Sequence, residues 1–269
     1  MDFQLWHFVL LGSALILAAL FILVLAEPGL PYRVNVRLPP VGEHTLLGLL
    51  AALVDTPVSD ATSIQVLTNG SHFYPRMLDD ITRAHRSIHL EAYVFHVSAI
   101  ADRLLASLCE RARAGVQVRL VIDSIGSVLT PDSYFADLRK AGGQVSWYQP
   151  IRWYTLKRFN NRTHRELLVI DGEVAFAGGA GVAAWWDKGA PELPPWRDMM
   201  VRLEGPVVTS LQAVFAENWL ECCGEILTGP RHWPTLEAAG STHAMLVKSS
   251  PSDRATVSRV VFQMLIEGA

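Results

Sequence analysis

The densest group of residues that could carry out chemistry lies between Thr163 and Asp171, in the sequence Thr-His-Arg-Glu-Leu-Leu-Val-Ile-Asp. Side chains alternate between the two faces of a strand, so His164 and Glu166 are expected to point together from the start of a buried strand. An imidazole and a carboxyl group are the side chains that most often act as base, acid or nucleophile. The segment therefore predicts a reactive site around His164.

Two neighbouring features suit this site to an anion. The glycines at positions 178, 179 and 181 leave main-chain N–H groups uncovered, so an anion can approach them. Upstream lies a collar of cations with no acid among them, formed by Arg152, Lys157, Arg158, Arg162 and Arg165. Each feature alone is usually an ordinary turn, loop or surface residue. Together they favour a site for a phosphate or an anionic lipid head group.

The elements that position this segment alternate between strands and helices. The expected elements are a strand over Ile64–Leu67, a helix over Phe73–His85, a strand over Ser87–Phe95, a helix over Ser98–Ala114, a strand over Val116–Ile122, a helix over Asp132–Ala141 and a strand over Gln144–Trp147. Helices between strands act as crossover connections, which predicts an α/β sheet packed on both faces.

The segment after residue 160 has a different pattern. Thr163–Ile170 and Val174–Ala177 are expected to form a hairpin, because Asp171-Gly172 is a strong turn signal. We expect a further strand over Asp198–Leu203, a helix over Pro206–Glu221, a strand near Met245–Lys248 and a helix over Ser252–Ala269.

The N-terminal segment predicts a membrane anchor. An uninterrupted apolar run without charge extends from Phe8 to Ala26, about the length that a spanning helix needs. A buried soluble helix would normally keep a polar stripe, and a cleaved signal peptide would normally carry Lys or Arg before its apolar core. Residues 1–27 are therefore assigned to a single-pass anchor, and 28–62 to a proline-bearing linker with one short helix over Thr45–Val54. The sparse flanking charges, Arg33 and Arg37, lean weakly toward a cytoplasmic body.

Composition narrows the class of protein. The chain has 269 residues, half of them apolar, so it can bury a substantial core. A net charge of -3 and a pI near 6.3 argue against a protein that holds nucleic acid through a global positive field. The three cysteines, Cys109, Cys222 and Cys223, match no zinc spacing and are taken as ordinary thiols.

The segment resembles the first catalytic motif of the phospholipase D superfamily, H-x-K, four residues, D, six residues, then G-[GS]-x-N. His164 and Asp171 match its first and last positions, and Gly178-Gly179 follow at the expected distance. Leu90–Phe95 before the motif, with Trp196–Asp198 and Arg202–Pro206 after it, are similar to bacterial cardiolipin synthases. The resemblance covers about Ile64–Ala269.

The resemblance implies a phospholipase D-like α/β sandwich, with a mixed sheet flanked by helices, and a two-step displacement at phosphorus. One His forms a phosphohistidine and the His of a second motif protonates the leaving alkoxide, without a metal or other cofactor. The acceptor is a lipid hydroxyl in a phosphatidyl transferase, or water in a hydrolase. The expected substrate is a phosphatidylglycerol-like phospholipid, and the expected location is the bacterial inner membrane.

The resemblance also implies roles for single residues. His164 would be the nucleophile or the general acid of its half, and Asp171 would hold the motif together. Asp198 stands where relatives have an acid that hydrogen-bonds the His of the other half. Glu91 would lie on a core strand beside the site, either as a supporting group or in a buried ion pair. The phosphate is expected to bind Arg162, Arg165, Gly178 and Gly179.

Two positions depart from the family pattern: Glu166 replaces the Lys and Gly181 replaces the Asn. A carboxylate reverses the sign where negative charge accumulates, unless Arg162 or Arg165 compensates or Glu166 is protonated or paired. A degenerate module that binds lipid or a partner is therefore the alternative to an enzyme, and a nuclease fits the motif but not the pI or the anchor.

No second motif occurs in these residues. The segment 63–240 is assigned to the first catalytic half, and 241–269 to the start of a second, truncated half. A weak repeat between Ile81–Ala84 and Ile266–Ala269 agrees with this division. The missing motif would come from a C-terminal region or from a second copy of the chain.

Overall fold

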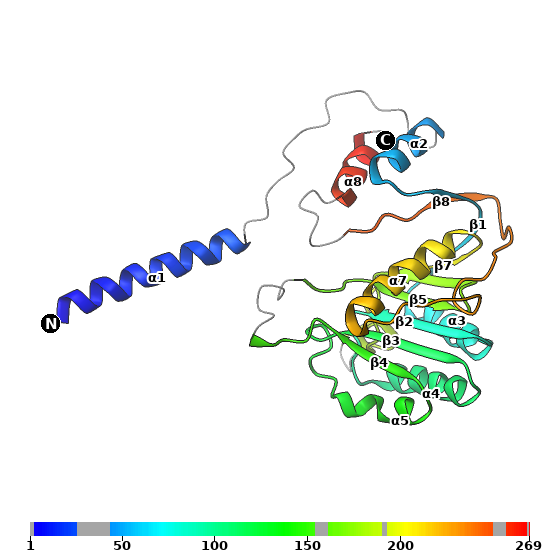
Figure 1. The fold of residues 1–269 in the computed structure, drawn as a ribbon, viewed down its shortest axis with the longest axis horizontal. Coiled ribbons are helices and arrows are strands. Elements are labelled where there is room, and N and C mark those ends of the chain that lie inside the picture. Colours follow the sequence, from blue (N-terminus) through cyan, green and yellow to red (C-terminus); the bar gives the residue numbers. More distant parts are fainter. Residues whose placement is uncertain (1–2, 26–43, 154–160, 190–192, 250–256, 268) are drawn as a thin grey trace. The chain divides into compact units, whose positions relative to one another are not determined.

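The computed structural model describes residues 3–25, 44–153, 161–189, 193–249, 257–267 and 269. The chain divides into two units, one made of Met1–Leu50 with Ser249–Ala269 and the other of Ala51–Lys248. The second unit contains a single sheet with helices on both faces (Figure 1). Lys157 and Arg158 of the predicted cationic collar lie outside the described residues, as does much of the predicted linker.

The sheet is mixed and has eight strands in the order β4-β3-β2-β5-β6-β7-β1-β8. Their bounds are β1 Val58–Thr68, β2 Ser87–Ala92, β3 Gln117–Asp123, β4 Gln144–Tyr148, β5 Glu166–Ile170, β6 Val174–Gly178, β7 Met199–Glu204 and β8 Thr242–Met245. β2, β3 and β4 run parallel to one another, whereas every other pairing is antiparallel. The predicted mixed sheet is confirmed.

Two helical layers cover the sheet. One contains α3 Gly70–Thr82, α4 Ala99–Arg113, the short η1 Asp132–Phe135, α5 Ala136–Lys140 and α6 Ala184–Asp187. Phe73, Leu104 and Leu138 of this layer share a core with Leu90 and Leu120 of the sheet. The other face is covered by α7 Val207–Cys223, whose Leu211, Phe215 and Trp219 pack with Val121 and Val169. The prediction of a sheet packed on both faces is confirmed.

After Glu166, the sequence of the central strand β5 is an unbroken apolar run because both faces of the strand are covered. Leu168 and Ile170 belong to the core under α3 and α4, whereas Leu167 and Val169 belong to the core under α7. Every residue of β5 is buried. A strand covered on both faces does not need alternating polarity, since both sets of side chains leave water.

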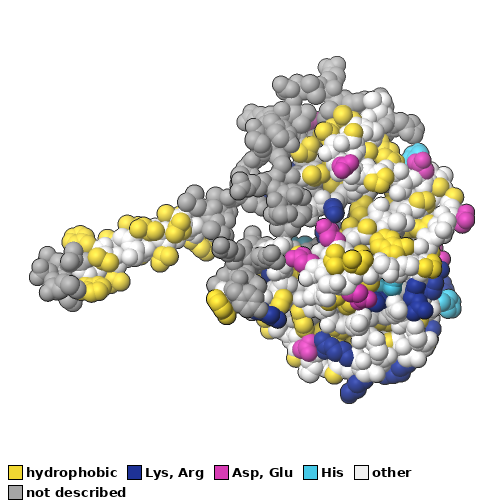
Figure 2. Space-filling view, in the orientation of Figure 1, with side chains coloured by type: hydrophobic (Ala, Val, Ile, Leu, Met, Phe, Trp, Pro, Cys, Tyr) yellow, Lys and Arg dark blue, Asp and Glu magenta, His cyan; other side chains and the backbone are white. Residues whose placement is uncertain are grey.

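The N-terminal unit contains α1 Phe3–Leu25, most of α2 His44–Val54, and α8 Val257–Glu267. The apolar side chains described on α1, from Trp6 to Ile22, are exposed (Figure 2). Among the described residues, no helix is both long and apolar enough to cross a membrane. The spanning helix stays a prediction, whereas the short helix expected over Thr45–Val54 is present as α2.

The C-terminal strand β8 pairs antiparallel with β1, with Val58 opposite Met245 and Ser59 opposite Ala244. It extends the same sheet that contains the predicted catalytic segment. The helix expected at the C-terminus is present as α8, with Val261 and Met264 buried. The proposed domain boundaries stay predictions.

Candidate active site

Most of the predicted site residues lie at one edge of the sheet, and Asp171 lies at the opposite edge. β2, β3 and β4 end at this edge because parallel strands bring their carboxyl ends together. Antiparallel pairing brings the start of β5, the end of β6, the start of β7 and the end of β1 to the same edge. We call it the His164 edge, and the opposite end of these strands the Asp171 edge.

His164 lies just before β5 and is exposed. Its imidazole meets the ring of Tyr93 edge-on, with 3.9 Å between ring centroids. The preceding residue, Thr163, is held by two acids: its N–H donates to Asp123 Oδ2 at 3.1 Å, and its hydroxyl donates to Glu91. The backbone that carries His164 is therefore fixed, while the imidazole stays open to solvent.

The start of β5 differs from the prediction. The strand begins at Glu166 and not at Thr163, because the N–H of Thr163 is bonded to the Asp123 side chain and not to a neighbouring strand. His164 and Glu166 also differ in environment, since the first is exposed and the second is buried. The expected pair on one strand face is replaced by an open imidazole beside a covered carboxyl group.

Glu166 is bonded to main-chain amides. Its Oε1 accepts the N–H of Tyr93 at 3.1 Å and the N–H of Val94 at 3.4 Å. Burial, the largest influence, raises the pKa of Glu166 to about 8, although the two amides oppose the shift. These surroundings favour a protonated Glu166 carboxyl at neutral pH. Protonation was one of the conditions under which an acid could replace the Lys of the family motif.

The two arginines that were expected to hold phosphate lie in different places. Arg162 is at the His164 edge, where its Nη1 lies 3.1 Å from Ser124 Oγ and 3.6 Å from Asp123 Oδ1. Arg165 points toward α7, donating to the carbonyl oxygen of Val214 at 3.0 Å and to Glu217 at 3.2 Å. Arg162 thus lies at the predicted edge with its side chain nearly buried against Asp123, whereas Arg165 lies elsewhere, and the phosphate-binding role of both stays a prediction.

The glycines are required by close packing. A Cβ built on Gly178 would lie 2.4 Å from the carbonyl oxygen of Met199, and one on Gly179 would lie 2.7 Å from Asp198 Oδ1. Their backbone thus runs directly beside Asp198. Neither position admits a side chain without movement of its neighbours, because contacts under 3.0 Å are repulsive.

Gly181 packs in the same way against Glu166, so the two departures from the family motif are neighbours. A Cβ on Gly181 would lie 2.5 Å from the carbonyl oxygen of Val94 and 3.1 Å from Glu166 Oε1. The Asn of the family pattern would not fit this backbone. The two changes therefore form one local rearrangement, in which Glu166 occupies space beside a residue without a side chain.

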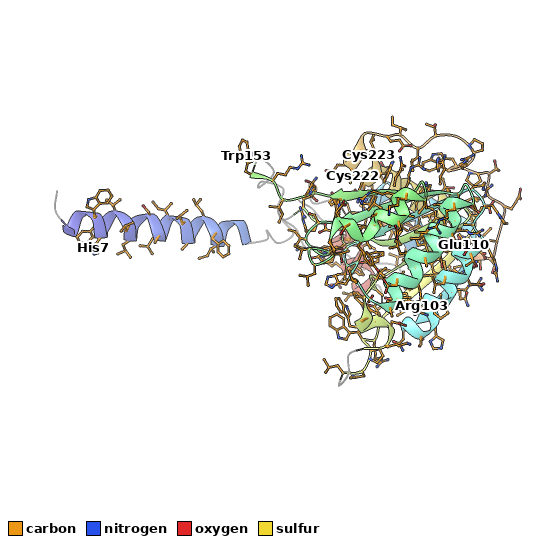
Figure 3. The ribbon with its side chains drawn as sticks, turned by 90° about the horizontal axis from the view of Figure 1, so that it is seen from below. His7, Arg103, Glu110, Trp153, Cys222 and Cys223 are labelled. Atoms are coloured by element: carbon orange, nitrogen blue, oxygen red, sulfur yellow. The ribbon has the colours of Figure 1, made fainter. Side chains whose placement is uncertain are left out.

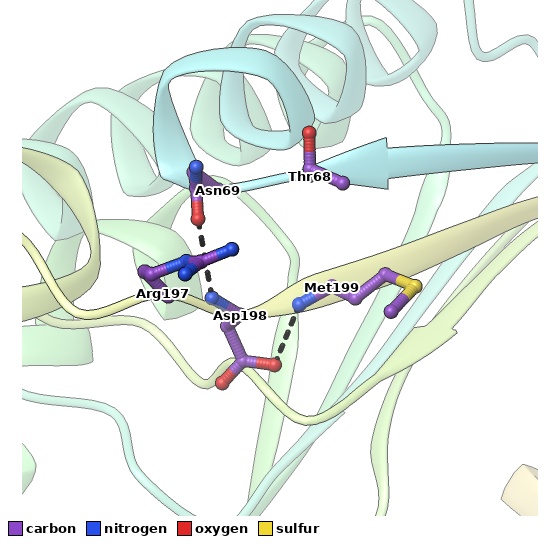
Figure 4. A pocket seen from close by; sticks show the side chains of 5 residues that line it. All are labelled: Thr68, Asn69, Arg197, Asp198 and Met199. Carbon is purple, nitrogen blue, oxygen red and sulfur yellow. Dashed lines mark hydrogen bonds between the residues drawn. The ribbon is translucent and has the colours of Figure 1, made fainter.

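Asp198 lies at the His164 edge, just before β7. Its Oδ2 accepts the indole N–H of Trp186 at 2.9 Å, and its Oδ1 accepts the N–H of Met199 at 2.7 Å. Beside it is an open pocket of about 610 Å³, lined by Thr68, Asn69, Arg197, Asp198 and Met199 (Figure 4). Asn69 also lines this pocket, and its side-chain oxygen accepts the N–H of Asp198 at 3.3 Å.

Arg197 and Asn69 also line this pocket, although the sequence pattern does not predict either of them as a site residue. Arg197 is exposed and contributes a cation to the pocket beside Asp198. Asn69 directly follows β1 with φ 63° and ψ 155°, a conformation outside the left-handed helical region that residues other than glycine rarely adopt. The sequence signal for Arg197 was its position next to Asp198, and no comparable signal marked Asn69.

Asp171 is at the other end of β5. Its Oδ1 accepts the N–H groups of Arg86 at 2.7 Å and Ser87 at 2.8 Å, and its Oδ2 accepts that of His85 at 2.9 Å. A strand of this length separates it from His164 by roughly 17 Å. The structure thus does not bring Asp171 to His164, and its contacts fit the expected role of holding the motif together.

Glu91 is fully buried on β2. Its Oε1 accepts bonds from the Thr163 hydroxyl and from Asn218 Nδ2, the latter at 2.5 Å. Burial raises its pKa to about 7. These contacts make Glu91 a support for the residue before His164. Among the described residues, no group of three or more His, Cys, Asp and Glu side chains is placed to hold a metal ion.

The fold and the motif at its edge define the class of protein. Residues 77–219 match the family model described as cardiolipin synthase, PLD-like domain. The chain belongs to this phospholipase D-like family.

The curated relatives are cardiolipin synthases. The chain is 31% identical over 235 residues to the cardiolipin synthase of Geobacillus sp. (strain WCH70), a match that covers 86% of the chain and 47% of the relative. It is 32% identical over 196 residues to the major cardiolipin synthase ClsA of Bacillus subtilis (strain 168), covering 72% of the chain and 41% of the relative. The chain spans about half the length of the curated relatives it matches.

Among solved structures, the chain is similar to Nuc from Salmonella typhimurium, a phospholipase D family member. The identity is 18% and the TM-score is 0.46, and the match covers 60% of this chain and 96% of that one.

Proposed function

We propose that the chain forms one half of a phosphatidyl transferase that resembles cardiolipin synthase. The observation that carries this proposal is an open imidazole, His164, on a fixed backbone at the sheet edge that also holds Arg162, Asp198 and Arg197. A nucleophile beside cations suits attack on a phosphodiester. The relatives are named cardiolipin synthases, which supports a phospholipid substrate such as phosphatidylglycerol.

The proposed reaction has two displacements at phosphorus. An imidazole nitrogen attacks the phosphodiester, a P–N bond forms, and the P–O bond to the departing alcohol breaks. The second imidazole gives its proton to that alkoxide. In the second step the hydroxyl of an acceptor lipid loses its proton to the same imidazole and attacks phosphorus, and the P–N bond breaks. Water in place of the lipid hydroxyl would make the reaction a hydrolysis.

The residues at the His164 edge divide the remaining work. Arg162 and Arg197 would attract the non-bridging phosphate oxygens. Glu166, when protonated, places no negative charge beside them and leaves its proton available for a hydrogen bond. Asp198 would hold the imidazole of the other half in one orientation, as an acid does toward a histidine base. The second motif would come from a second half or a second copy.

The nucleophile is tested by comparing two histidine substitutions in membranes from cells that make the protein. His164→Gln should abolish the conversion of radiolabelled phosphatidylglycerol to cardiolipin and the transfer of label to the protein. His85→Gln is the matched control, since His85 is exposed at the Asp171 edge and should leave both unchanged. Full turnover and labelling by the His164→Gln variant would remove this residue from the mechanism.

We also propose that the chain is held at the bacterial inner membrane by its N-terminal segment. The sequence from Phe8 to Ala26 has no charge, and α1 exposes apolar side chains that would otherwise face water. Removing residues 1–26 should make the protein extractable from membranes by alkaline carbonate, whereas the intact chain should resist this extraction. Replacing one apolar residue with another, as in Leu17→Ile, should leave the chain resistant. A deletion variant that resists carbonate as fully as the intact chain would contradict the anchor.

A second candidate is a degenerate module that binds phospholipid or a partner without turnover. It is favoured by Glu166 and Gly181, which replace two family residues and pack against each other. Activity that disappears in Glu166→Lys supports an enzyme with its own use of the acid. No turnover from the chain with a complementary second motif, together with retained lipid binding, supports the module.

A further inference from the structure

A set of large apolar side chains is exposed around the His164 edge. We call it the apolar rim and define it as Val97, Leu129, Ile151, Trp153, Leu193 and Trp196, which are between 54% and 85% exposed. All six lie in the loops that follow β2, β3 and β4 or precede β7. Apolar side chains grouped on one side of a molecule usually mark a surface that contacts a partner or a membrane.

Hydrogen bonds hold the rim loops to one another and to the site. The N–H of Phe95, in the loop after β2, donates to Ser127 Oγ in the loop after β3 at 2.8 Å. Ser124 Oγ donates to the carbonyl oxygen of Gln149, after β4, at 2.7 Å, and it also lies 3.1 Å from Arg162. Ser124 therefore links the loops after β3 and β4 to the side chain of the proposed phosphate-binding cation, Arg162.

The loop before β7 is fixed in a similar way. The N–H of Trp196 donates to the carbonyl oxygen of Trp185 at 2.7 Å, and their rings lie 5.7 Å apart. The neighbouring Trp186 donates to Asp198. Trp153, in contrast, lies in the loop after β4, where its exposed side chain projects away from the sheet (Figure 3).

Cations stand beside the apolar residues of the rim. Arg152 lies between Ile151 and Trp153, and Arg197 follows Trp196. The acid next to Arg197 is Asp198, which accepts bonds from the Trp186 indole and the Met199 N–H, and Asp187 is paired with Arg103 at 3.1 Å. Tryptophan beside arginine is the combination found where proteins meet the head-group region of anionic bilayers, because the indole lies among acyl chains while the guanidinium reaches phosphate.

We propose that the apolar rim enters the surface of an anionic phospholipid bilayer and thereby brings the head groups to His164. This inference rests on the proposed function in one respect, namely that the substrate is a membrane lipid. It adds a second membrane contact, made by the body of the protein and separate from α1. A second copy of the chain, whose apolar loops would cover the same residues, is the competing occupant.

The test uses the full chain bound to vesicles of phosphatidylglycerol with bromine on the acyl chains. Bromine quenches the emission of tryptophans that reach the acyl chains. Trp153→Phe and Trp196→Phe should each reduce the quenched part of the emission. Trp233→Phe should not, because Trp233 adjoins residues that pack on Gly172 at the Asp171 edge. Trp6→Phe measures the share that α1 contributes.

The outcomes separate this inference from the proposed activity, because quenching requires no turnover. Less quenching on brominated phosphatidylcholine than on brominated phosphatidylglycerol supports the role of the two arginines, and equal quenching overturns it. Unquenched emission from both Trp153 and Trp196 overturns the bilayer contact. If Trp153→Ser then converts a dimer into monomers, the occupant is a second copy of the chain.

Discussion

At the scale of single residues, the acid at the centre of the motif has the clearest consequence for stability. Burial raises the pKa of Glu166 to about 8 in the folded protein, whereas the ordinary pKa of a glutamate carboxyl group, as in an unfolded chain, is 4.5. Between these values the unfolded state has released a proton that the folded state keeps. The free energy of unfolding should therefore fall as the pH rises from the lower to the higher of these two pKa values. The stability that the neutral Glu166 carboxyl group contributes is fully present only below the lower value.

Glu166→Gln should remove this dependence, since a Gln side chain keeps an oxygen for the N–H groups of Tyr93 and Val94 and never ionises. We expect the free energy of unfolding near pH 7.5 to increase by about 1–3 kcal/mol. Urea denaturation from pH 5 to 8 measures the change. Glu110→Gln, at an exposed position on α4, is the control and should leave the pH profile unaltered. A Glu166→Gln profile as steep as that of the parent would contradict a neutral Glu166.

The contact between Gly181 and Glu166 predicts that substitutions at the two positions are coupled. Gly181→Asn places a Cβ against the carbonyl of Val94 and near the Glu166 carboxyl, so it should destabilise the fold by about 2–4 kcal/mol. Glu166→Lys removes one of the two obstacles. A double-mutant cycle in urea should then show a coupling energy of about 0.5–2 kcal/mol.

The control for this cycle is Gly224→Asn, at a position with φ 73° and no atom near a built Cβ. It should change stability little, because Asn adopts this conformation at modest cost. Additive effects of Gly181→Asn and Glu166→Lys would show that the two positions are not energetically coupled.

At the scale of elements, Asp171 joins the turn between β5 and β6 to the start of β2. It accepts the N–H groups of His85, Arg86 and Ser87, which would otherwise be left without partners where β2 begins. Asp171→Ala should lower the free energy of unfolding by about 2–4 kcal/mol, since three bonds to an ionised group are lost. Asp171→Asn keeps one acceptor oxygen and should cost less. The stability of both variants is measured in urea.

The activity of these two variants tests the assignment of Asp171 to a structural role. At temperatures where it stays folded, Asp171→Asn should keep most of the turnover, because no atom of this side chain approaches His164. A loss of turnover as deep as that of His164→Gln in a fully folded Asp171→Asn variant would mean that the carboxylate takes part in the reaction.

At the level of the assembled protein, the source of the second histidine decides how activity changes when unaltered chains are mixed with His164→Gln chains. If two copies of the chain form one site and both His164 residues are required, only pairs of unaltered copies are active. Equal mixing with His164→Gln should then leave about one quarter of the activity, as expected for a symmetric pair. If a separate second half completes the site, about one half should remain. Activity in co-reconstituted vesicles distinguishes the two.

The sequence alone predicts most of the secondary-structure elements and several residues of the site. Residues that alternate in polarity or cluster as apolar runs form their elements through local preferences and burial, so the strands and helices expected between Ile64 and Glu221 are present. Their ends differ most at β1, which starts at Val58 and not at Ile64, and at β5, which starts at Glu166 and not at Thr163. His164, Gly178 and Gly179 were identified from spacing, and the structure places them at one edge. Their catalytic and binding roles stay predictions.

Other features depended on the tertiary structure. Strand order and direction decided that Asp198, Arg197 and Asn69 meet at the His164 edge while Asp171 lies at the far end of β5. Packing against α7 turned Arg165 away, and burial made Glu166 a weak acid. The apolar rim appeared only when loops from distant parts of the chain came together. Spacing along a chain fixes which residues are available, but contacts across the sheet decide which meet and how they ionise.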